Sequence, residues 1–233
     1  MKERILKPEL MDDPLLEESK LTAALQDVTL VNKWLGGQQI TLDGIAYFFE
    51  KYHQESYTIT DMGCGDGEML RKMALFCRKR GVKASFIGFD FNAKSIVLAQ
   101  NRSADFPEIS FRQQDILKLT EKDELFDIIT STLTMHHFTD AEILNFLYCF
   151  EKRSVLGWVI NDLHRSKLAT ILFWGFSGIF MKTKIARYDG LISIGRAFKK
   201  KELIIFAKKL GLKHYKLQWR WAFRYLWIVD SKA

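Results

Sequence analysis

The stretch Ile59–Leu70, with the sequence ITDMGCGDGEML, decides the fold of this chain. It places Gly63, Gly65 and Gly67 between an apolar run and a helical pattern. The apolar run, YTITDM, predicts a short buried strand, and EMLRKMALFCRKRG predicts a helix that ends at Gly81. Glycines in such a strand–loop–helix unit allow positive φ angles and let the backbone approach a ligand closely.

Strands and helices alternate along the chain beyond this loop. The segments ASFIGFD, ISFRQQD, LFDIITSTL and SVLGWVINDL read as strands, and AKSIVLAQNRSA and DAEILNFLYCFEKR read as helices, the second with Asp140 as its expected N-cap. This alternation predicts a parallel sheet with helices on both faces. At the end, KHYKLQWRW and FRYLWIVDS follow each other closely and predict an antiparallel hairpin. The sequence therefore predicts a Rossmann-like α/β fold with a seven-stranded, mostly parallel sheet.

Two helices are predicted before the glycine loop. The first has apolar residues at helical spacing and stops at Gly36 and Gly37; these residues are Leu21, Leu25, Val28, Val31 and Leu35. The second is TLDGIAYFFEKYHQ. We expect residues 1–52 to form an N-terminal helical lid.

The composition is that of an ordinary globular domain. The 233 residues are 48% hydrophobic and 27% charged, with a net charge of +7 that suits either a solvated basic surface or an anionic partner. The three cysteines show no CxxC spacing, which argues against a disulfide framework and a zinc site, so no metal is predicted. The charged N-terminus is no signal peptide, and the longest apolar run is shorter than the ~20 residues of a membrane span. A reduced, cytoplasmic protein is expected.

The charge of the glycine loop indicates its ligand. Dinucleotide-binding loops have the spacing GxGxxG and hold a pyrophosphate at the helix N-terminus. Here the spacing is GxGxG, position 68 is Glu, and Asp61 and Asp66 add further negative charge. Such a turn repels a phosphate and attracts a cationic amino-acid group. The loop therefore favours S-adenosylmethionine over NAD.

Four segments resemble the successive motifs of class I S-adenosylmethionine-dependent methyltransferases. They are DMGCGDGEML, FIGFDFN, FRQQDILKL and FDIITSTLTMHHF, and the resemblance is strong from Thr58 to Asp162. The element TLTMHHF is similar to the small-molecule branch that includes ubiquinone and menaquinone methyltransferases. The flanks ELMDDP, VNKWLGG, VINDLHRS and DGLISIGRAF look like a bacterial subgroup of that branch, and none of these motifs defines its substrate.

The resemblance implies a set of cofactor-binding residues. Asp61 and the backbone of Gly63, Cys64 and Gly65 would hold the methionine part, and Asp90 the ribose. The adenine and the sulfonium would meet the remaining predicted residues, which are Phe91, Asp115, Ile116, Ser131 and Thr132. Singly, Asp90 and Asp115 could instead cap the turns that follow them. Because Asp61, Asp90 and Asp115 end three successive strands, the ligand interpretation is favoured. Cys64 is expected to be a small filler, not a nucleophile.

Three histidines are the predicted catalytic residues. His136 and His137 follow the fourth strand and could act as a general base, which is needed only if the acceptor loses a proton. Alternatively, they cap a helix or line the cofactor pocket. His164 follows the fifth strand together with Asn161, Asp162 and Arg165, where this fold commonly binds the acceptor.

The run LATILFWGFSGIFM, Leu168 to Met181, is apolar on all sides of a helical wheel. It is predicted to be a core helix, a pocket wall for a hydrophobic acceptor, or, with Lys182, Lys184 and Arg187 following, a contact to a membrane surface. The small residues Gly175, Ser177 and Gly178 are expected to leave room for a guest. The family pattern also places Asn32, Trp34 and Gly36 near the cofactor as part of the lid.

The predicted function is methyl transfer from S-adenosylmethionine, leaving S-adenosylhomocysteine, to a small hydrophobic acceptor such as a phenol, a quinol or a polyketide-like compound. The alternatives are a nucleic-acid (RNA) methyltransferase, which lacks supporting motifs here, and a non-catalytic cofactor-binding protein. No nucleic-acid partner is expected, and the oligomeric state is not predicted. The single domain would comprise the lid, a cofactor-binding core at 57–162, an acceptor-side insertion at 163–200, and a C-terminal helix and hairpin at 201–233.

Overall fold

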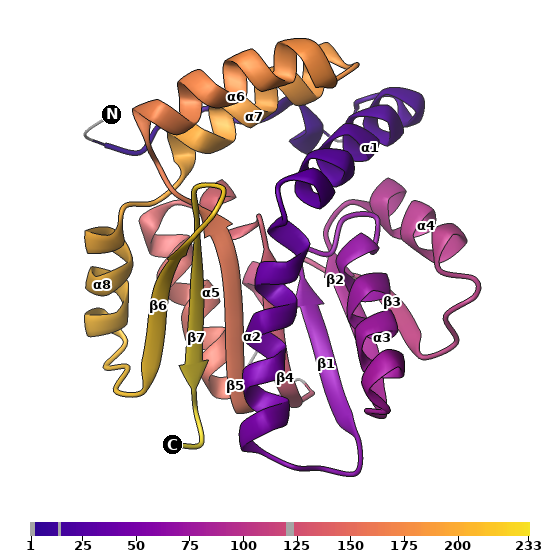
Figure 1. Ribbon diagram of the computed structural model, residues 1–233, viewed down its shortest axis with the longest axis vertical. Coiled ribbons are helices and arrows are strands. Elements are labelled where there is room, and N and C mark those ends of the chain that lie inside the picture. Colours follow the sequence, from indigo (N-terminus) through magenta and orange to yellow (C-terminus); the bar gives the residue numbers. More distant parts are fainter. Residues whose placement is uncertain (1–2, 14, 120–123) are drawn as a thin grey trace.

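The computed structural model describes residues 3–13, 15–119 and 124–233, which fold around one seven-stranded sheet (Figure 1). The strand order is β3-β2-β1-β4-β5-β7-β6. All neighbouring strands are parallel except the pairs that β7 makes with β5 and β6. The strands are β1 (Tyr57–Met62), β2 (Ala84–Asp90), β3 (Ile109–Gln113), β4 (Phe126–Thr132), β5 (Ser154–Leu163), β6 (Tyr215–Arg220) and β7 (Arg224–Asp230). The predicted sheet and its antiparallel C-terminal hairpin are confirmed.

Helices pack on both faces of the sheet, as predicted. One hydrophobic core lies under α2 (Gly37–Lys51), α3 (Glu68–Arg80) and α4 (Ala93–Arg102), and a second lies under α5 (Asp140–Arg153) and α8 (Lys200–Lys209). Successive side chains of a strand point to opposite faces. In β4, accordingly, Ile128 enters the first core and Ile129 enters the second.

Helix α5 begins with a capping box, and its N-cap is Thr139 rather than the predicted Asp140. The Thr139 hydroxyl accepts from the Glu142 backbone N–H, and the Glu142 carboxylate accepts from the Thr139 backbone N–H. Asp140 instead pairs with Arg4, at 2.8 Å, from the N-terminal segment. The Asp140 carboxylate thus forms an ion pair with Arg4, a residue far away in the sequence, and sequence spacing does not reveal this pair.

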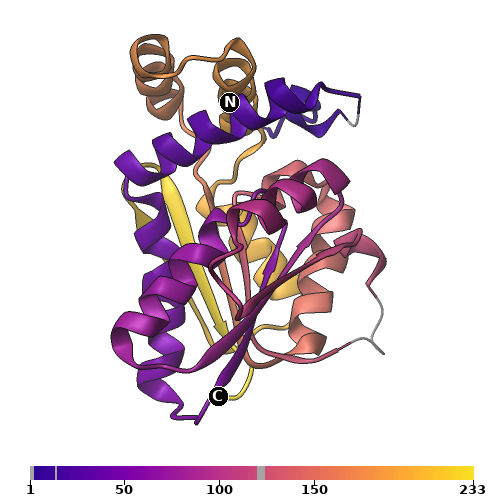
Figure 2. The ribbon, with the colours of Figure 1, turned by 90° about the vertical axis from the view of Figure 1, so that its right-hand side faces the viewer.

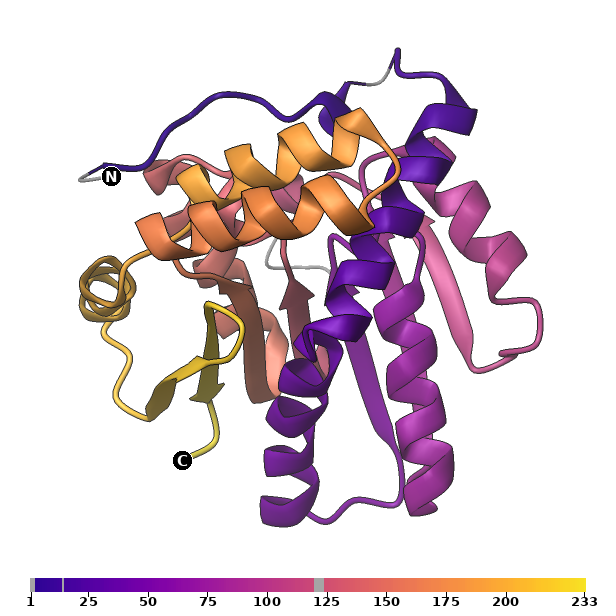
Figure 3. The same cartoon turned by 45° about the horizontal axis from the view of Figure 1, so that its top comes forward.

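A layer of helices lies over the carboxyl ends of the parallel strands (Figures 1 and 2). It consists of the short helix η1 (Leu10–Asp12), α1 (Glu18–Trp34), α6 (Lys167–Phe180) and α7 (Lys184–Arg196), and we call it the cover layer. Figure 3 shows α6 and α7 side by side across the top of the molecule. The cover layer has its own small apolar cluster around Ala24, Met181 and Ala186. No described helix is both long enough and apolar enough to cross a bilayer.

The predicted lid of residues 1–52 is too long. The chain does break after the first helix, because Gly36 has a left-handed conformation with φ 70° and α2 starts at the next residue. However, Ile40, Ile45 and Phe48 of α2 are buried in the first core, against the sheet. Of the predicted lid, only described residues before Gly36 belong to the cover layer.

Candidate active site

The glycine loop joins β1 to α3 with three residues in left-handed conformations. The φ angles are 81° for Gly63, 52° for Gly65 and 74° for Gly67, values that favour glycine. A Cβ at Gly63 would lie 2.4 Å from the side chain of Thr134, whereas a Cβ at Gly65 would meet nothing within 4 Å. Gly65 therefore leaves open space on the cavity side of the turn, where a ligand can approach the backbone.

Two carboxylates flank this loop at strand ends. Asp61, 1% exposed, accepts a hydrogen bond from the Thr130 hydroxyl at 2.9 Å and has no cationic partner among the described residues. Burial, together with nearby Asp90, raises the pKa of Asp61 to about 7. Asp90 accepts from the backbone N–H of Gly65 at 2.8 Å and of Asn92 at 2.9 Å, and burial raises its pKa as well. Both groups would gain from a ligand that offers positive charge or hydroxyl donors.

The acidic residues of the turn itself are not free to attract a cation. Asp66 pairs with Arg102, and Glu68 pairs with Arg71 at 2.9 Å and lies 3.6 Å from Lys72. These pairs offset the negative charge on which the sequence argument against a phosphate partly relied. The unpaired negative charge next to the loop comes from Asp61 and Asp90.

Most other predicted cofactor residues line the same cavity. They are Cys64, Phe91, Asp115, Ile116 and Thr132. Asp115 also accepts from the Leu117 backbone N–H at 3.1 Å, so it does cap the turn, as the alternative interpretation expected. Ser131 lies outside the cavity lining: it is fully buried, and its hydroxyl donates to the Met62 carbonyl at 2.9 Å. Burial raises the pKa of the Cys64 thiol well above its ordinary value, which suits a filler rather than a nucleophile.

The cavity continues from the glycine loop to the underside of the cover layer. Its volume is about 740 Å³. On the far side from the loop it is lined by apolar residues of α1, α6 and α7, namely Leu21, Leu25, Val28, Val31, Leu172, Phe173, Phe176, Ala186 and Ile194. One space therefore has a polar end at the strand termini and an apolar end under the helices.

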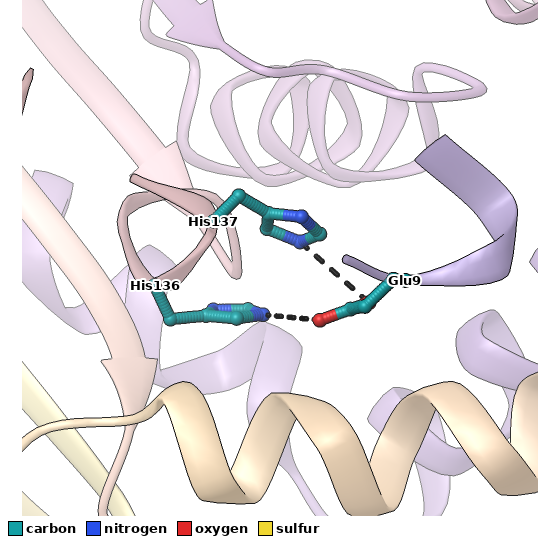
Figure 4. Close-up of side chains that lie close together, drawn as sticks. All are labelled: Glu9, His136 and His137. Carbon is teal, nitrogen blue, oxygen red and sulfur yellow. Dashed lines mark ion pairs between the residues drawn. The ribbon is translucent and has the colours of Figure 1, made fainter. Parts of the chain in front are cut away.

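His136 and His137 lie side by side in the cavity wall, in the short helix η3 (Met135–His137). Another short helix, η2 (Ile116–Lys118), contributes Ile116 to the cavity lining. The rings of His136 and His137 are 4.4 Å apart between centroids. Figure 4 shows both rings facing the carboxylate of Glu9, which comes from the N-terminal segment. The Nδ1 atom of His136 lies 2.7 Å from Asp162, and the Nδ1 atom of His137 lies 2.9 Å from Asp12.

The electrostatics of this group follow from burial and mutual contact. Burial alone lowers the pKa of His136, but the carboxylates of Asp162 and Glu9 together raise it to about 9. Burial alone raises the pKa of Glu9, but His136 and His137 lower it to about 2. The side chain of His136 is 2% exposed, that of His137 is 24% exposed, and the Nε2 atoms of both lie next to Glu9. A general-base role for either histidine stays a prediction.

His164 lines the cavity, but its predicted polar neighbours do not. Its Nδ1 atom accepts from the Trp219 indole N–H at 3.2 Å, and burial, with Lys199 and Arg165, lowers its pKa. The other three side chains of the predicted cluster are buried in the protein, where Asn161 donates to the Gly37 carbonyl, Asp162 binds His136, and Arg165 pairs with Glu202. Only His164 of that cluster can reach an acceptor.

Helix α6 is neither a core helix nor uniformly a pocket wall. Leu172, Phe173 and Phe176 face the cavity, whereas Gly175, Ser177 and Gly178 line a separate, outer groove beside α7. The prediction that these small residues make room in the acceptor pocket is therefore wrong, because they lie on the other side of the helix. In the predicted lid, Asn32 lines the cavity and accepts from Arg224, while Trp34 packs edge-on against Phe180.

Glu9, Asp12 and Arg224 also line the cavity, although no sequence pattern predicts them there. Glu9 and Asp12 lie in a charged segment without hydrophobic periodicity, so no pattern assigned them to a site. Arg224 begins the last strand and is 3% exposed, and burial lowers its pKa to about 10. Only the packing of distant segments brings these three residues to the cavity.

The sequence and the fold of this chain are both similar to those of known methyltransferases. A family model described as a methyltransferase domain matches residues 53–154. The chain is also 30% identical over 83 residues to 2-phytyl-1,4-naphtoquinone methyltransferase from Thermosynechococcus vestitus. That match spans 36% of this chain and 36% of the relative, so it covers about a third of each protein.

Solved structures share the fold across most of the chain at low identity. Magnesium protoporphyrin IX methyltransferase from Synechocystis PCC 6803, with bound SAH, has a TM-score of 0.59 at 16% identity and covers 86% of both chains. The plantazolicin methyltransferase BpumL, in complex with SAH, has a TM-score of 0.66 at 14% identity, over 91% of this chain and 95% of its own. The methyltransferase-like fold therefore extends beyond residues 53–154, over most of the described chain.

Proposed function

We propose that the protein transfers a methyl group from S-adenosylmethionine to a small apolar acceptor, such as a phenol, a quinol or a polyketide-like compound. The observation that carries this proposal is the continuous cavity of about 740 Å³ between the glycine loop and the cover layer. Its volume lies within the range of about 300–1,000 Å³ that is common for small-molecule sites. The partial likeness to a naphthoquinone methyltransferase supports an acceptor of this kind.

The residues at the polar end fit the cofactor. S-adenosylmethionine supplies a methyl group activated by a sulfonium. Asp61 would accept from its cationic amino group, which would supply the positive charge that this buried carboxylate lacks in the free protein. Asp90 uses one lone pair of each oxygen for Gly65 and Asn92, and its remaining lone pairs would accept from the ribose hydroxyls. Phe91 would pack on the adenine.

The residues at the other end fit an apolar acceptor with a polar handle. Because the Nδ1 atom of His164 accepts a hydrogen bond, its neutral ring carries the proton on Nε2. His164 would therefore donate to an oxygen of the acceptor and orient it, rather than remove its proton. The apolar side chains of α1, α6 and α7 would enclose the remainder of the acceptor and exclude water. Such positioning is the principal contribution an enzyme makes to transfer from an activated donor.

Transfer of label tests the proposal. Purified protein is incubated with methyl-labelled cofactor and a panel of phenols, quinols and RNA, and labelled products are separated. We expect label in small apolar compounds and stoichiometric formation of S-adenosylhomocysteine. Label in RNA alone, or tight cofactor binding without transfer to any class of acceptor, would contradict the proposal and favour one of the alternatives.

We also propose that the outer face of α6 rests on an anionic membrane surface. This face exposes large apolar side chains that no described segment covers: Leu168 at 55%, Ile171 at 65%, Trp174 at 71% and Ile179 at 77% exposure. No acidic residue occurs from Leu163 to Tyr188, while Lys167, Lys182 and Lys184 are exposed at the helix ends. An apolar face with a basic rim suits anionic lipid. Dimerisation through this face is disfavoured, because it would bring the lysines of the two copies close together.

Vesicle sedimentation tests this contact. We expect the protein to sediment with vesicles that contain phosphatidylserine or phosphatidylglycerol, less with phosphatidylcholine alone, and less after Ile171→Asp. The matched control is Val155→Asp, which replaces an exposed apolar residue of β5 away from the cover layer. Binding that does not depend on lipid charge or on Ile171, or a dimer in ultracentrifugation that Ile171→Asp dissociates, would overturn the membrane assignment.

A further inference from the structure

Three potential metal ligands meet in the wall of the cavity (Figure 4). The Nε2 atom of His136 lies 3.5 Å from one Glu9 oxygen, and the Nε2 atom of His137 lies 3.8 Å from the other. The three ligand atoms all lie within 4.8 Å of one another. A metal ion bonded to such atoms at about 2.0–2.1 Å would need only small movements of the side chains.

Both imidazole rings are oriented by a carboxylate at Nδ1, as is common for histidines that bind a metal through Nε2. The Nδ1 atom of His136 bonds to Asp162, and the Nδ1 atom of His137 bonds to Asp12. A carboxylate at Nδ1 keeps the proton on that nitrogen, so each ring can bind a metal through Nε2, with the metal displacing any proton held there. In both rings the Nε2 atom is directed at the same space beside Glu9. The Ser193 hydroxyl in turn donates to Glu9 at 2.7 Å and holds the carboxylate in place.

The Nε2 atom of His136 is a buried polar atom without a hydrogen-bond partner among the described residues. The side chain is 2% exposed, and such orphan atoms are rare in folded proteins. The nearest acceptor is the Glu9 oxygen at 3.5 Å, which is longer than the usual limit of about 3.2 Å for an N–H···O bond. An ion between the two atoms would satisfy both of them.

The surrounding charge also suits a cation. Glu9, Asp12 and Asp162 bring three carboxylates to two imidazoles. No described arginine forms an ion pair with these three carboxylates, although Arg4 and Arg224 lie near enough to attract Asp162. Arg4 and Arg196 donate to backbone carbonyls in and next to η3 instead. A divalent ion at the shared point would offset this negative charge directly.

We propose that Glu9, His136 and His137 bind one divalent transition-metal ion, with Zn²⁺ as the probe, and that this ion holds an oxygen of the methyl acceptor. Two imidazole nitrogens and one carboxylate form a ligand set of borderline softness, which suits Zn²⁺, Co²⁺ or Fe²⁺ better than Mg²⁺. Three protein ligands leave a coordination position open, as in catalytic zinc sites, and all three residues line the cavity. The acceptor part of this proposal rests on the proposed function.

The proposal changes the role of the two histidines. With both Nε2 atoms bonded to a metal, neither ring can serve as a general base. A bound metal would instead lower the pKa of a coordinated hydroxyl, as it does for bound water, so that the acceptor gives its proton to solvent before transfer. The acceptor oxygen would then form a bond to the methyl carbon as the carbon–sulfur bond of the sulfonium breaks and S-adenosylhomocysteine leaves. The sequence contained no sign of this site, because Glu9 lies far from the histidines in the chain and no cysteines take part.

Metal binding is tested first, independently of methyl transfer. Chelator-treated protein is titrated with Zn²⁺ by calorimetry, and the metal content after dialysis is measured by mass spectrometry. We expect one ion per chain, a loss of affinity of at least tenfold in Glu9→Gln and in His137→Asn, and a loss of about 10–100-fold in Asp162→Asn, which removes a supporting bond. His214→Asn, a change to an exposed histidine outside the cavity, is the control. Binding of less than one equivalent, or equal affinity in all variants, would overturn the site.

Acceptor coordination is tested second, with Co²⁺ in place of Zn²⁺. A catechol or a phenol added to the Co²⁺ protein should shift its visible absorption spectrum, and anisole, which lacks the hydroxyl, should not. An unchanged spectrum with a full equivalent of bound metal would reject the acceptor role. Because both measurements are made without a methyl donor, failure of the metal proposal is distinguishable from failure of the proposed methyl transfer.

Discussion

At the scale of single residues, Asp61 should link the stability of the free protein to cofactor binding, because its buried carboxyl is proposed to meet the amino group of the cofactor. Its pKa of about 7 lies above the ordinary value of a carboxyl group because the side chain is buried. Ionisation of Asp61 therefore costs free energy in the folded state. The free energy of unfolding of the ligand-free protein should fall as the pH rises toward 7 and stay low above it. A cationic ligand group removes this cost.

Replacing Asp61 with Asn should raise thermal stability at pH 8 and weaken cofactor binding. The amide is neutral at every pH, so the gain in melting temperature should be larger at pH 8 than at pH 5. At pH 5 the folded wild-type carboxyl is neutral, and only the ionisation of the unfolded chain still favours unfolding of the wild type. Melting curves at both pH values and calorimetry with S-adenosylhomocysteine measure the two effects. Equal gains at the two pH values would show that the effect arises from packing rather than ionisation.

Asp90→Ala should weaken S-adenosylmethionine binding at least tenfold. Removal of a charged acceptor of two hydrogen bonds costs about 1.5–3 kcal/mol, which corresponds to a tenfold change or more. Because Asp90 also holds the Gly65 backbone, the melting temperature of the variant is measured alongside its affinity. Unchanged affinity would remove Asp90 from the ribose role, and preferential binding of NAD would overturn the cofactor assignment.

The residues that sequence could predict are those whose place follows from a strand end. Asp61, Asp90 and Thr132 line the cavity because parallel strands finish at one edge of the sheet. Ser131 precedes Thr132 and points to the other side, a distinction that strand alternation could have supplied. Glu9 could not be predicted, since it reaches the cavity only through packing of an irregular segment against α7.

At the scale of elements, the start of α5 offers a test of local stability. Thr139→Ala removes the capping hydroxyl, which should cost about 1 kcal/mol and lower the melting temperature by about 2–4 °C in a chain of this size. Thr139→Ser keeps the hydroxyl and should melt close to wild type. Equal losses in the two variants would mean that the methyl group, and not the cap, stabilises this position.

Substitutions on the two faces of α6 should have different effects, one on acceptor binding and the other on contact with a surface. Leu172 faces the cavity and Ile171, its neighbour, does not. With a soluble acceptor and no lipid, Leu172→Asp should raise KM for the acceptor several-fold, because a charge meets the apolar end of the cavity, while Ile171→Asp should leave KM unchanged. Steady-state kinetics measure both, and a similar rise in the two variants would argue against the assigned orientation of the helix.

The boundaries of the helices could be predicted from the sequence better than the surfaces against which the helices pack. The glycines at 36, 67 and 81 mark helix boundaries in the structure, as the sequence indicated. The sequence, by contrast, predicts α2 as part of the lid, whereas Ile45 and Phe48 of α2 are fully buried against the sheet. Periodicity shows that a helix has an apolar face but does not show which surface that face meets.

At the scale of the whole molecule, cofactor binding should stabilise the entire fold. A ligand at one hundred times its Kd adds about 2.7 kcal/mol to the free energy of unfolding, or roughly 5–10 °C in melting temperature for a chain of this size. Wild-type protein with S-adenosylhomocysteine should show this shift, and Asp90→Ala should show little of it at the same concentration. A shift of equal size in the variant would place the ligand elsewhere.

The cover layer has its own apolar cluster, around Ala24, Met181 and Ala186, apart from the two cores of the sheet. We therefore expect the cover layer, proposed to enclose the acceptor, to tolerate sequence change without disturbing the glycine loop and strand ends proposed to bind the methyl donor. Divergence of α1, α6 and α7 would then alter which compound is methylated while the donor stays the same. A chimaera that exchanges these three helices for those of another methyltransferase should keep donor affinity and acquire the foreign acceptor range.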